Sequence, residues 1–148
     1  MQTPDLNGAL TDLRSADKHV RARAVACLIQ VGTSAIPPLL ELLNDSDWVI
    51  RYRAAEALGG IGDIRTIDHL IARTMDENDH VRYMATKSLA KMQDPRIVPV
   101  LMKMLTDEHT YTRRIAAEGL RALGSENATL TLQEPREEQS DPDVQKSA

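Results

Sequence analysis

The sequence predicts an all-α fold, a right-handed α-α superhelix built as a short solenoid of antiparallel helix pairs. One pattern of apolar residues and arginine recurs four times, with the arginines at positions 21, 51, 82 and 113. Within each copy the apolar residues stand three and four positions apart, which is the spacing of one face of a helix. Recurrence at about 30 residues is typical of solenoids, whose units bury their apolar faces against each other.

The composition fits one helical domain. The 148 residues have the length of a single domain, and 42% are hydrophobic and 27% charged. We expect neither a signal peptide nor a membrane span, because the N-terminus lacks a basic and an apolar region and no apolar run reaches about 18 residues. The single cysteine excludes an internal disulfide and favours a cytoplasmic protein.

The first 16 residues are predicted to be the second half of a repeat whose first half is missing. A helix is expected over residues 4–14, with Pro4 in its first turn, where a proline is tolerated. Its apolar face is formed by Leu6, Ala9, Leu10 and Leu13. This face has the same spacing as the second helix of the next repeat, about thirty residues later.

Three full repeats follow at about 17–45, 46–76 and 77–107, with a partial fourth at 108–132. In the first of them one helix is predicted over 18–31, with Asp17 as its N-cap. Asp47, Asn78 and Asp79 offer the same cap in later copies. A second helix is predicted over 35–44, because Pro37 and Pro38 fall in its first turn, where a missing N–H costs least.

The acidic excess lies after residue 124. Residues 1–124 hold sixteen acidic and sixteen basic side chains, so the whole net charge of −4 falls on residues 125–148. A neutral repeat body argues against nucleic-acid binding, which needs a basic surface to displace counterions. Residues 128–132 are a candidate stub of the fourth repeat, and the polar residues 133–148 are predicted to be a disordered acidic tail.

The segment Asp47–Asp63, DWVIRYRAAEALGGIGD, carries the repeat in full. It resembles the HEAT repeat, and more narrowly the short repeat of the phycobilisome-lyase type, whose pattern is D-x-x-V-R-x-x-A-A-x-A-L-G-x-I-G-D. The resemblance covers about residues 1–132. It implies that the first helices form a convex outer face and that the second helices line a concave groove, which usually binds protein. Some members of this family help to attach or remove bilin chromophores on phycobiliproteins.

Two other families built from similar repeats fit less well. Deoxyhypusine hydroxylase binds two irons through His-Glu pairs placed immediately before A-A-x-A-L-G. Here those positions hold Ala22-Arg23, Tyr52-Arg53, Tyr83-Met84 and Arg114-Ile115. Iron has no ligands there, so this activity is rejected. A HEAT protein of the DNA-alkylation-repair type needs a basic groove, which the neutral body disfavours.

The arginine column is the most regular polar feature. We expect it to form a structural ladder of ion pairs and carbonyl contacts at the junctions between repeats. The ladder residues are Arg21, Arg51, Arg82 and Arg113, with Asp17, Asp47, Asn78 or Asp79, and Asp107 as partners. The alternative is recognition of an anionic ligand by the four aligned guanidiniums.

We expect no catalytic, cofactor or metal site. Acids and His80 in the turn at 76–80 could hold a divalent cation loosely, but a solvated turn with capping acids is the preferred interpretation. His19 and His109 lie near similar turns, and no Cys/His spacing of a zinc site exists.

Cys27 shares a column with small residues and is expected to be a packed core thiol rather than a nucleophile.

Binding is expected in the groove, on the non-core positions of the second helices. The candidate protein-binding residues are Pro38, Glu41, Leu42, His69, Arg73, Val100, Lys103 and Met104. Leu42, Val100 and Met104 at outward positions would form a modest apolar surface flanked by charge, which suits a protein partner. The alternative makes them ordinary surface or inter-repeat core. A second candidate surface lies near the starts of the first helices, at Trp48, Tyr52 and Tyr83.

The preferred function is therefore a non-catalytic, cofactor-free scaffold that grips a protein or peptide in its groove. The alternative is a bilin lyase or a chaperone-like accessory protein acting on phycobiliproteins. Repeat edges that lack a neighbour tend to associate, so weak homo-oligomerisation is a further expectation unless residues 125–132 cover one end.

Overall fold

The computed structural model describes residues 5–124 and Pro142. The predicted stub at 128–132 and the acidic tail at 133–148 therefore lie outside the described residues, apart from that proline. The α-helices are α1 (Leu6–Asp12), α2 (Lys18–Val31), α3 (Ile36–Leu42), α4 (Trp48–Ile61), α5 (Ile67–Arg73), α6 (Asp79–Ala90), α7 (Val98–Met104) and α8 (Thr110–Ala122). Short 3-10 turns η1 (Gly32–Ala35), η2 (Ile64–Thr66) and η3 (Pro95–Ile97) precede α3, α5 and α7.

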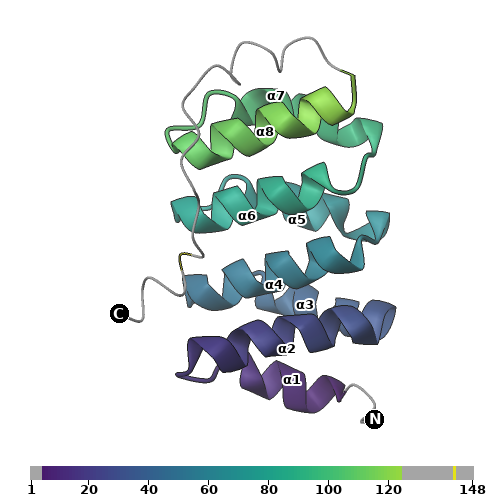
Figure 1. Ribbon diagram of the computed structural model, residues 1–148, viewed down its shortest axis with the longest axis vertical. Helices are drawn as coiled ribbons and strands as arrows, with labels where there is room; N and C mark the ends of the chain where they lie inside the picture. The colour runs from purple at the N-terminus through teal and green to yellow at the C-terminus, as the bar shows by residue number, and fades with distance from the viewer. Residues whose placement is uncertain (1–4, 125–141, 143–148) are drawn as a thin grey trace.

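The helices form a two-layered solenoid, which confirms the predicted all-α class. Helices α2, α4, α6 and α8 stack side by side in one layer, with α3, α5 and α7 in the layer behind (Figure 1). The first layer is called the A layer below, and the helices α1, α3, α5 and α7 are called the B helices. Within residues 5–124, α1 packs on α2, α3 on α4, α5 on α6 and α7 on α8. Grouped by packing, the helices thus make four pairs, and the predicted half-repeat belongs to a complete pair.

Helix starts follow the predicted caps. Asp17 accepts a hydrogen bond from the backbone N–H of His19 at 2.8 Å, and Asp47 accepts one from Val49 at 2.9 Å. Asn78, rather than Asp79, caps α6 by accepting from the N–H of His80 and Val81. Each cap satisfies backbone donors that have no partner inside the helix.

Small residues allow the A layer to stack closely. The four-alanine column Ala24, Ala54, Ala85 and Ala116 is buried. At Gly59 an added Cβ would lie 2.3 Å from the Ser88 hydroxyl, so α6 approaches α4 more closely than any side chain there would permit. Ser88 is 1% exposed and donates a 2.7 Å hydrogen bond to the carbonyl of Ala55, which satisfies its hydroxyl inside the interface.

One stretch is apolar enough to pass for a membrane span, although no such span was expected from the sequence. Within the 25 residues Lys18–Leu42, an 18-residue window has a mean hydropathy of 1.5, so the stretch is long and apolar enough for a membrane span by length and composition alone. Gly32, at φ 79°, interrupts the stretch, and the two parts fold as α2 and α3. Leu28 and Leu39 are fully buried in the core of the solenoid, although only 28% of the apolar window is buried.

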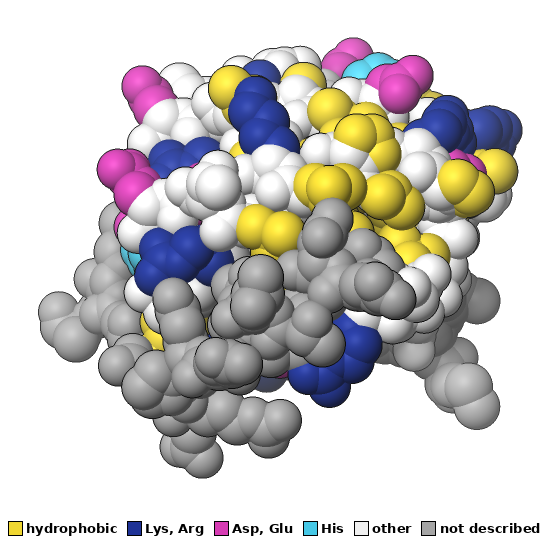
Figure 2. Space-filling model, turned by 90° about the horizontal axis from the view of Figure 1, so that it is seen from above, with side chains coloured by type: hydrophobic (Ala, Val, Ile, Leu, Met, Phe, Trp, Pro, Cys, Tyr) yellow, Lys and Arg dark blue, Asp and Glu magenta, His cyan; other side chains and the backbone are white. Residues whose placement is uncertain are grey.

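The α7–α8 end has no further described helix pair stacked on it. Figure 2 looks onto this end and shows hydrophobic side chains gathered among basic and acidic groups. Ile115, Leu105 and Leu123 on these elements are partly buried, and Met102 is 41% exposed. The expectation of weak self-association through the ends stays a prediction.

Gln93 provides a test of the turns after the A helices. Its φ is 55°, a left-handed conformation that glycine adopts after α4 at Gly62 and after α8 at Gly124. We expect Gln93→Gly to raise the free energy of unfolding by about 1 kcal/mol, because a side chain in this conformation is strained. Denaturant unfolding measures the change.

Arg23→Gly is the control, since Arg23 is exposed in the interior of α2 and the substitution should lower the free energy of unfolding by about 1 kcal/mol. A loss of stability in both variants would contradict the assignment of strain to Gln93.

Candidate functional site

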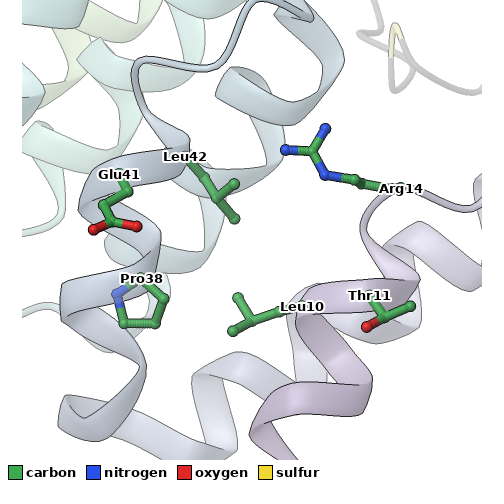
Figure 3. A pocket seen from close by; sticks show the side chains of 6 residues that line it. All are labelled: Leu10, Thr11, Arg14, Pro38, Glu41 and Leu42. Atoms are coloured by element: carbon green, nitrogen blue, oxygen red, sulfur yellow. The ribbon is translucent and has the colours of Figure 1, made fainter.

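A hollow between α1 and α3 contains three of the predicted groove residues. Pro38, Glu41 and Leu42 line it together with Leu10, Thr11 and Arg14, and its volume is about 390 Å³. In Figure 3 the side chains of Leu10 and Leu42 point into the space between the two helices, with Arg14 at the rim. The hollow therefore has an apolar floor and a charged rim.

The rim is held by an ion pair between the first two hairpins. Arg14 donates to the carboxylate of Asp45, and the side chain of Arg14 is 55% exposed while that of Asp45 is 13% exposed. The hydrogen bond from Arg14 holds the pKa of Asp45 below its ordinary value. Sequence analysis missed Leu10 and Arg14 as groove residues, because it assigned Leu10 to the core face and treated α1 as an end cap.

A second hollow, of about 360 Å³, lies at the ends of α5 and α7. Its lining residues are Thr74, Met75, Arg82, Lys103, Met104, Thr106, Asp107 and Glu108. Lys103 is exposed, as predicted, and its Nζ lies 3.1 Å from the sulfur of Met75. Met75 is 63% exposed, so it supplies apolar surface that the sequence analysis did not assign.

Met104 is a correction to the predicted outward position. It is 4% exposed and belongs to the hydrophobic core, because its long unbranched side chain fills the space between α7 and its neighbours.

Arg73 is likewise not a free groove residue. It donates to Asp76 at 3.2 Å and to the carbonyl of Leu43 at 3.4 Å. His69 is exposed and Val100 is partly buried, so both remain available on the B helices.

The arginine ladder is present, and its carbonyl contacts repeat with one geometry. Each arginine donates from Nη1 to the carbonyl six residues earlier, in the loop between the two helices of a packed pair. The donor–acceptor distances are 2.6 Å for Arg21 to Ser15, 2.8 Å for Arg51 to Asp45, 3.0 Å for Arg82 to Asp76 and 2.8 Å for Arg113 to Asp107. The ladder therefore fixes each A helix to its own loop.

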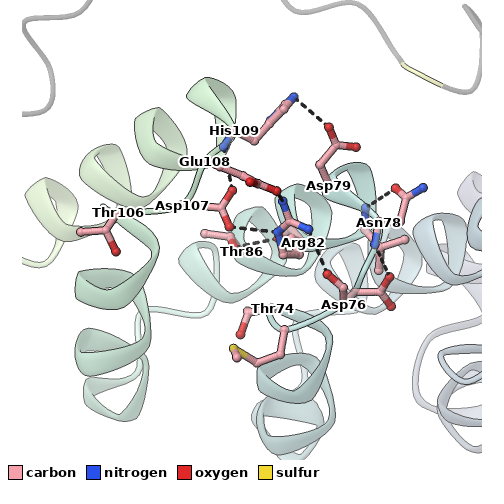
Figure 4. A network of polar contacts seen from close by, with 12 residues as sticks. Thr74, Asp76, Asn78, Asp79, Arg82, Thr86, Thr106, Asp107, Glu108 and His109 are labelled. Atoms are coloured by element: carbon pink, nitrogen blue, oxygen red, sulfur yellow. Dashed lines mark hydrogen bonds and ion pairs between the residues drawn. The ribbon is translucent and has the colours of Figure 1, made fainter.

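The same loop acids join consecutive pairs. Arg51 binds both oxygens of Asp76, at 2.9 Å from Nε and 3.1 Å from Nη2, and Asp76 belongs to the next loop. Arg82 repeats the contact with Asp107 at 2.9 Å, and Figure 4 shows it bridging two loops. We call this contact, an arginine bonded to the acid of the following loop, the loop clamp.

The predicted partners of the ladder need correction. Asp17 and Asp47 accept from helix N–H groups rather than from arginines, because an aspartate directly before a helix is already placed to cap it. Of the predicted partners, Asp107 does bind an arginine of the ladder, namely Arg82. The missed partner is Asp76, and the signal for it was an acidic column two residues before the caps, at Asp45, Asp76 and Asp107.

The histidine turns bring His80 and His109 close to the carboxylate of Asp79. The Nε2 atoms of His80 and His109 each lie 3.7 Å from a carboxylate oxygen of Asp79. Among residues 5–124 no three His, Cys, Asp or Glu side chains gather in a way that could hold a metal ion. Cys27 is partly exposed rather than fully packed, with its sulfur 3.9 Å from the carbonyl of Asp5.

Comparison with known proteins identifies the repeats. The family model of HEAT repeats matches residues 7–81 and again residues 67–148. No curated protein matches this chain. Among solved structures, the complex of CpcE and CpcF of phycocyanin lyase from Nostoc sp. PCC7120 matches with a TM-score of 0.75 and 22% identity, over 96% of this chain and 94% of that one. At this identity the likeness shows a common fold.

Removal of a clamp arginine tests the ladder. The side chains of Arg51 and Asp76 are 8% and 3% exposed, so Arg51→Ala leaves a buried carboxylate without its main partner. We expect the free energy of unfolding to fall by about 3 kcal/mol or more. The exposed pair Arg65–Asp63 supplies the control, because Arg65→Ala should cost less than about 1 kcal/mol. Equal small losses in both variants would contradict a structural clamp.

Acid unfolding tests the pair at the rim of the first hollow. Because the pKa of Asp45 is lowered in the folded state, its stabilisation is present above the ordinary pKa of about 3.9 and is lost as the pH falls through the folded value. Asp45→Asn should therefore flatten the fall in stability below about pH 4, as followed by circular dichroism. An acid transition of unchanged steepness would contradict this assignment.

Proposed function

This chain belongs to the HEAT-repeat family, and we propose that it is a scaffold that binds an extended segment of another protein along its B helices. The hollow between α1 and α3 is the observation that carries the proposal. Leu10, Pro38 and Leu42 form its floor, and Thr11, Arg14 and Glu41 supply the polar rim. Apolar anchors within a polar rim are typical of the central part of protein–protein interfaces.

The size of the hollow suits part of a partner rather than a whole small ligand. A volume of about 390 Å³ lies near the lower end of ligand pockets. The walls come from two short helices on the surface of the solenoid, and the space is open along the B helices (Figure 3). It can therefore receive one or two apolar side chains of a segment that continues along the groove.

The second hollow extends this surface. Met75, in the loop after α5, and Lys103 on α7 are exposed, and His69 on α5 is exposed as well. Met side chains adapt to different apolar groups, and Lys103 favours an acidic group on the partner. The proposed partner thus presents an apolar anchor to α1 and α3 and an acidic group to α7.

A second candidate function is supported by the solved structure with the same fold. That structure is a complex of two proteins of phycocyanin lyase. The corresponding proposal is that this chain acts with a partner protein in attaching or removing a bilin chromophore on a phycobiliprotein. The scaffold surface would then hold the partner or the phycobiliprotein.

Substitution of Leu42 tests the groove. Immobilised wild-type chain, Leu42→Asp and Ala26→Asp are exposed to lysate of the source organism, and retained proteins are compared by mass spectrometry. Leu42 lines the hollow, whereas Ala26 is exposed on the opposite layer. We expect Leu42→Asp to reduce retention of the partner about tenfold or more, because a charge replaces an apolar contact. Retention of the same proteins by the wild type, Leu42→Asp and Ala26→Asp would contradict binding in the groove.

The two candidate functions are separated by chromophore transfer. Wild-type chain is produced together with a bilin, an apo-phycobiliprotein and the partner captured above. A covalently coloured phycobiliprotein that Leu42→Asp fails to yield supports the lyase role. A captured partner without covalent colour supports the scaffold alone.

A further inference from the structure

The two charged residues that line the hollow between α1 and α3 differ in what they bind. Arg14 is paired with Asp45, so its positive charge is already matched within the protein. Glu41 is exposed, and among residues 5–124 no hydrogen bond or ion pair engages its carboxylate. Arg73, on the next B helix, is taken up by Asp76 at 3.2 Å. The hollow therefore presents one negative charge without a counter-charge.

Helix stability does not account for an acid at position 41. The last turn of α5 carries Arg73 and that of α7 carries Lys103, whereas the last turn of α3 has no basic residue. A cation is favoured near the carbonyl end of a helix, and an anion is disfavoured there. Glu41 thus adds a negative charge at the end of α3 where the other two helices place a positive one. A cation supplied from outside would be favoured by both the carboxylate and the helix end.

Figure 3 shows how this charge lies relative to the apolar floor. The Glu41 side chain lies beside Pro38 at the edge of α3, and Arg14 lies on the other side of Leu42. Glu41 and Pro38 are three residues apart in the helix, so they share one face. An apolar side chain bound on the floor would have an unmatched carboxylate on one side and a matched ion pair on the other.

We infer that the hollow binds a protein segment in which a lysine or arginine stands within about two residues of the apolar anchor, and that Glu41 pairs with this base. The inference rests on the proposed function and specifies the chemistry of its partner. In an extended segment, residues two positions apart point to the same side and are about 7 Å apart. One segment can therefore place its anchor on the floor and its base over the edge of α3.

The pair also gives the segment a direction. The proposed partner presents an acidic group to Lys103 on α7, and it presents a base to Glu41 on α3. A segment bound in the reverse direction would bring like charges together at both places, which is unfavourable. The charges at the two ends of the groove thus select one orientation of the segment along the B helices.

Peptide selection tests the inference with a defined probe. A phage library of random peptides is selected on immobilised full-length wild type, Glu41→Lys and Glu118→Lys. Glu118 is exposed on α8 in the other layer, so this control changes the net charge by the same amount away from the hollow. The wild type and Glu118→Lys should enrich a base within two residues of an apolar residue. Glu41→Lys should enrich an acid at the same place.

A double-mutant cycle then measures the pair in solution. A selected peptide, and its form with alanine in place of the base, are titrated against the wild type and Glu41→Gln. The alanine form should bind the wild type about threefold more weakly than the selected peptide does, which is in the range of an exposed ion pair. The two peptides should bind Glu41→Gln with equal affinity, because the carboxylate is absent.

Two results would overturn the inference and leave the proposed function intact. One is the same charge preference on the wild type and on Glu41→Lys, and the other is an equal loss in both arms of the cycle. Selected peptides that bind Leu42→Asp as tightly as the wild type would overturn the proposed function as well, because the apolar floor would then not belong to the site.

Discussion

The structure depends on one carboxylate in each of the last three loops between packed helices, namely Asp45, Asp76 and Asp107. Asp76 accepts the N–H of Asn78 within its own loop and binds Arg51 of the preceding pair. Asp107 makes the same two contacts, with His109 and Arg82. A buried acid with this many donors is stable only when all of them are in place, so the clamp sets the position of each helix pair on the previous one. The stack is then a set of rigid units joined at fixed points.

The fixed stack determines what each layer can do. Because the clamp and the caps lie at the loop ends, the B helices keep short exposed faces that line the hollows, and Leu42 and Lys103 stay accessible. Two long A helices carry aromatic and basic groups on the opposite side. The groove with its apolar anchors therefore lies on the layer opposite to these aromatic and basic groups.

Much of the fold could be predicted from the sequence, because the repeat multiplies each signal. The period placed α2 at residues 18–31, and the arginine column indicated a junction ladder. The partners were harder to predict, because aspartates two residues apart, Asp45 and Asp47, perform different tasks that only backbone geometry separates. Met104 was misplaced because a helical pattern gives the direction of a side chain but not how far a long one reaches into the core.

The central claim is that the loop clamp makes neighbouring helix pairs one cooperative unit. Native-state hydrogen exchange of the backbone amides in α4 and α6 tests it most directly. The slowest amides of both helices should exchange through one opening with a common free energy, since the contacts of Arg51 with Asp76 and of Gly59 with Ser88 are lost together. Amides of α6 that exchange freely while those of α4 remain protected would contradict the account.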